Sequence, residues 1–175
     1  MLPQTLEELE ALRAECKSMV TKRAGLSAGA AVVPIPGIDL GADMTLLMEM
    51  IPAINQKFGL NPDQIEGLDP KVKRIILIGA TSLGSTFVGK WVTKELVVQL
   101  LKTMGVRVTT KSVAKFVPFL GQAVAASISF GAMKMLGNAH VEDCYKVAKK
   151  ALLSLESNTP RVIQVTPDMI ESPKR

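Results

Sequence analysis

Two residues that could form a nucleophilic pair lie four positions apart near the C-terminal end of the chain. His140 and Cys144 fall on one face of a predicted helix, where an imidazole can deprotonate a thiol for nucleophilic attack. Such a pair also needs an oriented site with oxyanion donors, and no surrounding motif indicates one. His140 is the only histidine, which argues against a hydrolytic triad and a histidine-rich metal site. The favoured interpretation is a partly buried thiol near a surface imidazole.

Two aspartates, Asp39 and Asp43, have the same spacing and could act as a carboxylate pair in acid–base catalysis or cation binding. A simpler interpretation accounts for both residues. Asp39 is suited to cap the start of a helix, and Asp43 complements the positive end of the helix dipole. We therefore expect no catalytic residues, no metal site and no cofactor, and we predict that the chain is not an enzyme.

The segment from Gly84 to Lys90 fits the Gly-x4-Gly-Lys pattern of a phosphate-binding loop. Trp91 follows where that loop carries Ser or Thr, and an indole cannot hold the magnesium ion that the hydroxyl binds. The segment also lies inside a predicted helical run, whereas a phosphate-binding loop joins a strand to a helix. The sequence therefore predicts that this chain does not bind nucleotides.

The composition is that of a folded helical protein. Of the 175 residues, 47% are hydrophobic and 21% are charged, which favours one folded domain over a disordered chain. Aromatic residues make up only 4%, which leaves little material for stacking on bases, so no nucleic-acid partner is expected. Two cysteines without CxxC spacing favour a reducing compartment, and the acid-rich N-terminus does not fit a signal peptide.

Hydrophobic spacing and capping residues predict an all-α fold, a compact bundle of about six helices. Thr5 and Glu8 form a capping box, and Asn-Pro and Asp-Pro pairs at 61–62 and 69–70 each start a helix. Residues 75–78 could form a buried strand by composition alone, but the Asp-Pro start just upstream favours a helix. The expected helices cover residues 5–23, 39–57, 70–104, 121–136 and 138–155, with a short turn after Asn61 and a short element at 109–117.

The predicted organisation has three parts: an N-terminal amphipathic helix (1–23), a helical hairpin domain (24–156) and a flexible tail (157–175). Two proline–glycine segments, 33–37 and 117–121, predict tight corners between apolar helices. In each, proline would end one arm and glycine would supply the turn conformation. We therefore expect two apolar helical hairpins, with a structural corner motif made of Pro34, Pro36, Gly37, Asp39, Pro118 and Gly121.

Three runs without charged residues, at 24–38, 75–89 and 116–133, raise the question of a membrane span. Each is shorter than the roughly 20 apolar residues that cross a bilayer. Two interpretations stay open: these runs are buried helices of a compact domain, or they are short hairpins that dip into one leaflet.

A basic stretch, residues 90–115, follows the second of these runs. It contains six basic residues and one acidic residue, Glu95, and the only tryptophan of the chain lies near its start. Basic residues beside a tryptophan are attracted to an anionic membrane surface, although a solvated helix face has the same composition. The residues that we expect to contact anionic lipid are Lys90, Trp91, Lys94, Lys102, Arg107, Lys111 and Lys115.

Three segments of the chain resemble bacterial domain-of-unknown-function family 697. The resemblance is carried by residues 24–39, which contain Pro-Ile-Pro-Gly-Ile-Asp, by residues 115–124 with the later Leu136-Gly137, and by residues 57–60. The second corner departs from the first, because it has Leu120 where the first has Pro36. The resemblance implies an all-helical, membrane-associated module of the kind often fused to, or encoded beside, an Era-like GTPase domain. It implies no catalytic residues.

From these observations we expect a non-enzymatic, membrane-associated helical module that is accessory to a separate GTPase. The alternative is a soluble helical protein-interaction module, for example a toxin or immunity-type partner. The expected location is the cytoplasmic side of the inner membrane, peripheral or partly inserted, with the cytoplasm as the alternative. The expected partners are a membrane surface or inner leaflet, a GTPase or other protein, and a second copy of the chain.

Overall fold

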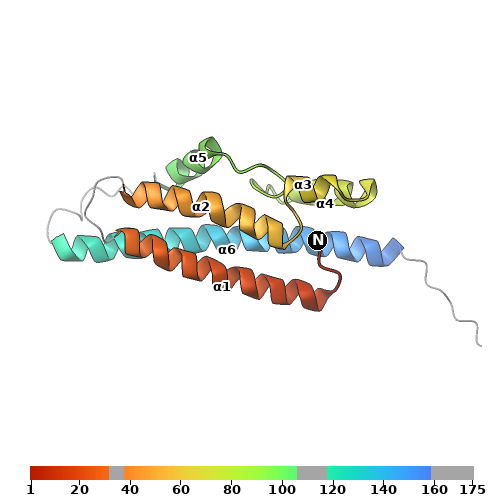
Figure 1. The fold of residues 1–175 in the computed structure, drawn as a ribbon, viewed down its shortest axis with the longest axis horizontal. Coiled ribbons are helices and arrows are strands. Elements are labelled where there is room, and N and C mark those ends of the chain that lie inside the picture. Colours follow the sequence, from red (N-terminus) through yellow and green to blue (C-terminus); the bar gives the residue numbers. More distant parts are fainter. Residues whose placement is uncertain (32–37, 106–117, 159–175) are drawn as a thin grey trace, which may run out of the picture.

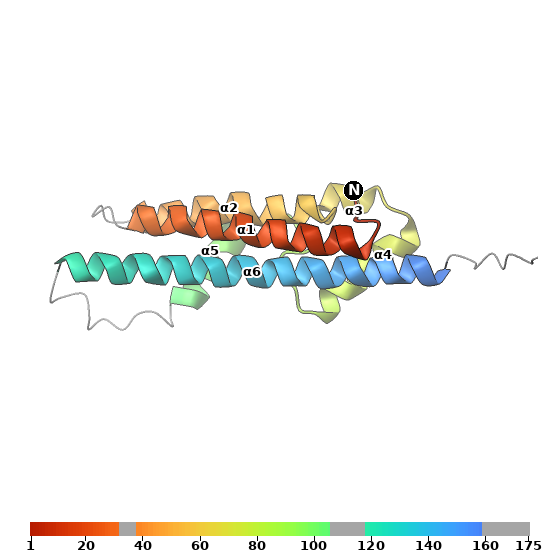
Figure 2. The ribbon, with the colours of Figure 1, turned by 90° about the horizontal axis from the view of Figure 1, so that it is seen from below.

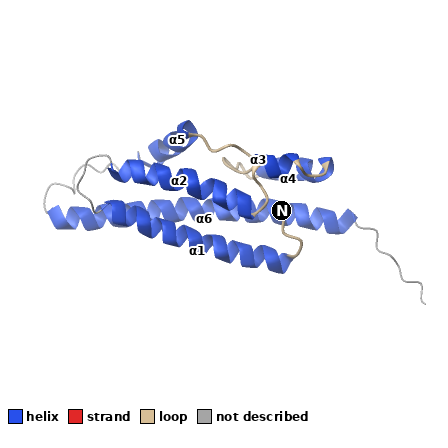
Figure 3. Cartoon of the chain, in the orientation of Figure 1, coloured by secondary structure: helices blue, strands red, loops and turns tan. Residues whose placement is uncertain are grey.

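The computed structural model describes residues 1–31, 38–105 and 118–158, and every regular element in these ranges is a helix (Figures 1 and 3). The predicted all-α class is therefore confirmed. Residues 75–78 lie within a helix, which excludes the alternative of a buried strand. The helices are α1 (Leu6–Ala31), α2 (Ile38–Lys57), α3 (Pro62–Glu66), α4 (Pro70–Ser82), α5 (Lys94–Gly105) and α6 (Pro118–Asn158).

Three long helices, α1, α2 and α6, lie alongside one another and form the body of the molecule (Figures 1 and 2). α1 runs opposite to both α2 and α6, and α6 extends beyond both ends of α1. The antiparallel course of α1 and α2 is what the predicted first hairpin requires. α4 packs against the C-terminal half of α6, and α5 lies against α2.

The core lies where the three long helices meet. Leu9, Cys16 and Val20 recur on one face of α1 and are fully buried. Side chains of α1 and α2 lie very close to Gly137 in α6. A Cβ atom there would lie 2.6 Å from a Val20 methyl carbon and 2.9 Å from the terminal methyl carbon of Met50. Glycine at this position therefore lets α1, α2 and α6 pack at short range.

Polar pairs flank this core on the α1–α6 side. The guanidinium of Arg13 binds both carboxylate oxygens of Glu142, at 2.7 and 2.9 Å. Lys17 approaches the same carboxylate at 2.6 Å, and the Tyr145 hydroxyl donates to Glu10. Burial alone would raise the pKa of Glu142, but the hydrogen bonds from Lys17 and Arg13 outweigh it and hold this pKa below its ordinary value. These pairs set the register of α1 against α6.

Three predicted helix boundaries differ from the structure. The first helix does not end at residue 23 but continues to Ala31, so the boundary drawn between residues 23 and 24 falls inside α1. The run of small uncharged residues does not break a helix, because alanine favours helix and glycine costs only about 1 kcal/mol. The predicted helix 70–104 is interrupted by a loop at residues 83–93, which we call the α4–α5 loop.

The third difference concerns α6, which is one continuous helix of 41 residues. Asn138 was predicted to start a separate helix, but it lies in the middle of α6. Pro118 is the first residue of the helix, so Gly121 lies inside its first turn and does not form the predicted corner. Proline at a first helical position lacks only an N–H that would be unpaired anyway, so it can begin the second arm instead of ending the first.

The first corner residues, Pro34, Pro36 and Gly37, lie outside the described residues. None of the described helices combines the length and the apolar character needed to cross a bilayer. The predicted tail beyond Asn158 also lies outside the described residues.

Candidate functional site

The basic residues predicted to contact lipid are only partly described by the structure. Lys90, Trp91 and Lys94 lie in or beside the α4–α5 loop, and all three are exposed, with 66% of Trp91 accessible to solvent. Lys102 lies in α5, in a part whose side chains are not described. Arg107, Lys111 and Lys115 are outside the described residues. The α4–α5 loop is therefore the described part of the predicted surface.

The loop begins where glycine ends α4. Gly84 has φ +64°, and its N–H donates to the Thr81 carbonyl at 3.0 Å, while the Ser85 N–H donates to the Ala80 carbonyl at 3.0 Å. This pair of bonds is a Schellman motif, which needs a residue in the left-handed conformation after the helix. Gly89, at φ +69°, supplies a second left-handed position. The two glycines of the Gly-x4-Gly-Lys pattern thus shape a loop between two helices.

Side chains from α2 and α6 hold the loop in place. The amide Nδ2 of Asn55 in α2 donates to the Phe87 carbonyl at 3.0 Å. The Phe87 ring is buried and packs edge-on against His140 of α6, with ring centroids 5.6 Å apart. Within the loop, the Val88 N–H donates to the Ser85 hydroxyl oxygen at 3.3 Å. The loop is therefore fixed to both α2 and α6 through Phe87.

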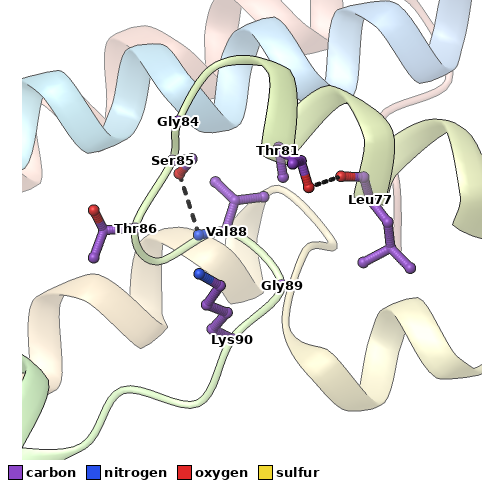
Figure 4. Close-up of a pocket in the computed structure, with 9 residues that line it drawn as sticks. Leu77, Thr81, Gly84, Ser85, Thr86, Val88, Gly89 and Lys90 are labelled. Carbon is purple, nitrogen blue, oxygen red and sulfur yellow. Dashed lines mark hydrogen bonds between the residues drawn. The ribbon is translucent and has the colours of Figure 1, made fainter.

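A cavity of about 470 Å³ lies between this loop and α4 (Figure 4). Lys90 is its only charged lining residue, and its side chain extends back beneath the loop toward Val88 (Figure 4). The cavity falls within the size range of pockets that bind small molecules. Its lining residues are Leu77, Ala80, Thr81, Gly84, Ser85, Thr86, Val88, Gly89 and Lys90.

The predicted pair His140 and Cys144 does come together, with 3.5 Å between Nε2 and Sγ. The imidazole is not at the surface, however, because only 3% of His140 is exposed. Asn55 completes the cluster: its Oδ1 lies 3.0 Å from His140 Nε2 and accepts from the Cys144 thiol at 3.4 Å. Since Nδ2 of this amide donates to Phe87, Oδ1 is the acceptor and His140 Nε2 carries the proton.

Burial sets the protonation of this cluster. It lowers the pKa of His140 to about 4 and raises the pKa of the Cys144 thiol well above its ordinary value. Both groups are therefore neutral near pH 7, whereas a Cys–His nucleophile depends on an imidazolium–thiolate pair. The cluster has the chemistry of a structural clamp that links α2, α6 and the loop.

Asn55 is the residue that sequence analysis does not single out. The available signal is its register, since Leu47, Ile51 and Asn55 follow one another at four-residue steps along α2. All three are buried. A lone amide on such a stripe must find hydrogen-bond partners inside the protein.

The aspartate pair gives no evidence of a metal site. α2 begins at Ile38, so Asp39 is the second residue of the helix and not the cap that precedes it. The side chains of Asp39 and Asp43 are not described. Among the residues that the structure describes, no three His, Cys, Asp or Glu side chains are grouped to hold a metal ion. Both cysteines, Cys16 and Cys144, are free and buried.

Comparison with known proteins finds one distant similarity to a GTPase. No family model matches the chain, and no solved structure matches it at a significant level. The chain is 28% identical over 164 residues to Interferon-inducible GTPase 5 of Bos taurus. The match covers 90% of this chain and 35% of that protein, so the chain spans about a third of the length of its relative.

Proposed function

We propose that this chain is a non-enzymatic helical module that binds an anionic membrane surface through the α4–α5 loop and serves a separate GTPase. Its place would be the cytoplasmic face of an inner membrane, as a peripheral protein. The exposed Trp91, flanked by Lys90 and Lys94, is the observation that carries the membrane part of the proposal.

An exposed indole between two lysines suits the interface of a bilayer. Its ring is apolar enough to enter the headgroup region, while its N–H remains solvated, and each nearby lysine adds about 1 kcal/mol of attraction to anionic lipid. α4 adds apolar surface beside the loop, because Leu77, Ile78 and Leu83 are each more than 40% exposed. Leu77 lines the cavity together with Lys90, which places it next to the loop.

Two observations support the GTPase part of the proposal. The chain is similar to about a third of a protein named as a GTPase, and its sequence resembles a helical family that often accompanies Era-like GTPase domains. The loop from Gly84 to Lys90 is not suited to bind the nucleotide itself, because it joins two helices and is followed by Trp91. Another domain would then supply the nucleotide site.

The single tryptophan makes the membrane proposal directly measurable. We expect the emission of Trp91 to shift to shorter wavelength on addition of vesicles that contain an anionic lipid, and the protein to float with them. Lys90→Glu with Lys94→Glu should abolish both effects. Lys22→Glu with Lys71→Glu is the matched control, since it changes the net charge equally at exposed positions in α1 and α4.

Unshifted emission with anionic vesicles, or equal losses in both double variants, would contradict the membrane proposal. The soluble protein-interaction module would then be the better interpretation. For the GTPase part, a fluorescent GTP analogue should not bind the chain alone, and saturable binding would contradict a separate nucleotide site.

A further inference from the structure

We propose that the cavity under the α4–α5 loop is a binding site for a phosphate ester with an apolar tail, the headgroup end of an anionic phospholipid. This inference rests on the proposed membrane function and gives it a specific lipid contact. The phosphate would lie against Lys90 and Thr86, and the glyceryl end of the tail against Leu77 and Val88. Nothing in the inference involves a nucleotide or a metal ion.

The cationic half of the cavity is Lys90. Among the residues that the structure describes, no carboxylate lies within 4.0 Å of its ammonium group. No other charged residue lines the cavity. A lysine that lines a concave site without an ion-pair partner is available to an anion, and phosphate is a preferred partner.

The hydroxyl groups of the lining divide into two kinds. Thr81 donates its hydroxyl to the Leu77 carbonyl at 2.8 Å, and the Ser85 hydroxyl oxygen accepts from the Val88 N–H at 3.3 Å. These two hydroxyls therefore shape the cavity. The Thr86 hydroxyl makes no hydrogen bond within the part of the chain that the structure describes, and it is exposed, so it can donate to a ligand oxygen.

The remaining wall is apolar. Leu77, Ala80 and Val88 line it, and Leu77 is 42% exposed. Gly89 closes this side tightly, since a Cβ atom there would lie 3.1 Å from Ile65 Cδ1 and 3.8 Å from Leu77 Cδ2. Inorganic phosphate would leave this apolar wall exposed to solvent. The tail of an amphiphile would cover the wall, and the burial of apolar surface would add to the free energy of binding. The combination favours a lipid over inorganic phosphate.

The position of the cavity agrees with the membrane proposal. Trp91 follows Lys90 directly in the chain, so a lipid phosphate held by Lys90 would lie beside the indole that enters the interface. The same juxtaposition makes Trp91 a reporter of occupancy.

The test uses dioctanoyl phosphatidate below its critical micelle concentration, titrated into the full chain while Trp91 emission is recorded. We expect saturable binding with one lipid per chain. Dioctanoylglycerol, which lacks the phosphate, and inorganic phosphate, which lacks the tail, should each bind at least about tenfold more weakly. Equal affinity for either of these two ligands would overturn the assignment.

Lys90→Gln and Lys94→Gln form the decisive pair of variants, because both remove one exposed charge near Trp91 and only Lys90 lines the cavity. Lys90→Gln should weaken phosphatidate binding about tenfold, and Lys90→Arg should retain most of it. Lys94→Gln should change it less than twofold. Equal effects of Lys90→Gln and Lys94→Gln would overturn the cavity as the site. Circular dichroism of each variant confirms that the fold is retained.

Vesicle flotation separates this inference from the proposed function. If the chain binds soluble phosphatidate through Lys90 but does not float with anionic vesicles, the cavity site stands and the membrane function fails. If the chain floats with vesicles and soluble phosphatidate does not bind, the membrane function stands and the cavity site fails.

Discussion

At the scale of single residues, the most informative group is the buried cluster of Asn55, His140 and Cys144. One amide hydrogen-bonds the Nε2 side of an imidazole, a thiol and the Phe87 carbonyl, and therefore connects α2, α6 and the α4–α5 loop. A buried polar group that lacks a hydrogen-bond partner lowers the free energy of unfolding by about 1–3 kcal/mol. Removing one of the three side chains would leave the others without partners, so they stabilise the loop together.

Acid should destabilise the protein through His140. Burial lowers its folded-state pKa to about 4, below the ordinary value of 6.5, so between these values the unfolded chain binds a proton that the folded chain does not. The contribution to stability is complete above pH 6.5 and declines as the pH falls toward 4. We expect a loss of roughly 2–3 kcal/mol between pH 7 and pH 4.5 from this group.

The His140→Gln variant tests this pH dependence by urea denaturation at both pH values. Glutamine can still donate to Asn55 but does not titrate, so the pH-dependent loss of stability should be smaller in the variant by that amount. Because Asp143 and the other carboxyl groups are common to both proteins, the difference isolates the imidazole. If the free energy of unfolding falls by the same amount between the two pH values in His140→Gln and in the unsubstituted protein, His140 does not titrate as a buried group.

At the scale of the elements, the length of α6 explains how one helix serves the whole molecule. It packs on α1 along one face, contacts α2, and presents Val147 and the Lys150 stem to Gly79 of α4. Its glycines differ in their surroundings, since Gly137 lies against Val20 of α1 and Met50 of α2, whereas Gly131 is exposed with no atom near a Cβ position.

These two glycines give a matched pair of substitutions in one helix. Gly137→Ala should destabilise the protein by roughly 1–3 kcal/mol, because a methyl group would meet Val20 at 2.6 Å. Gly131→Ala should stabilise it by up to about 1 kcal/mol, since alanine favours helix and the position is open. Thermal unfolding of both variants measures the effects. Similar shifts of Tm in both would contradict the close packing at Gly137.

At the scale of the whole molecule, α1 belongs to the same core as the rest of the chain. Its buried stripe contributes Leu9, Cys16 and Val20 to one cluster with α2 and α6, and Arg13 and Lys17 bind Glu142 across the interface. The division at residue 23 drawn from composition therefore does not correspond to a break in packing.

Removal of residues 1–23 should unfold the remainder of the chain. The truncation exposes the faces of α2 and α6 that Leu9, Cys16 and Val20 cover, and each buried side chain of this size contributes about 1.5–3 kcal/mol. We expect loss of helical circular dichroism and of a cooperative thermal transition. A truncated chain with an unchanged transition would show that residues 1–23 form a separate unit.

The sequence by itself determined the all-α class and how several of the helices begin. Asn61-Pro62 and Asp69-Pro70 start α3 and α4 as predicted, and the hydrophobic spacing in α1 buries Leu9 and Cys16. These signals are local, because capping and periodicity act within one or two turns. The interruption at residues 83–93 was missed since a left-handed glycine and a helical glycine look alike in sequence.

Only the tertiary structure decided where the chemistry-bearing residues meet. Asn55 and His140 are 85 positions apart, and no local pattern pairs them. Their contact depends on how α2 packs on α6, which also buries the imidazole and sets its pKa. The cavity beside Lys90 has the same origin, because the loop that forms it is held through Phe87 by Asn55 of α2 and His140 of α6. Spacing along the chain places residues on a helix face, and the packing of helices determines what that face contacts.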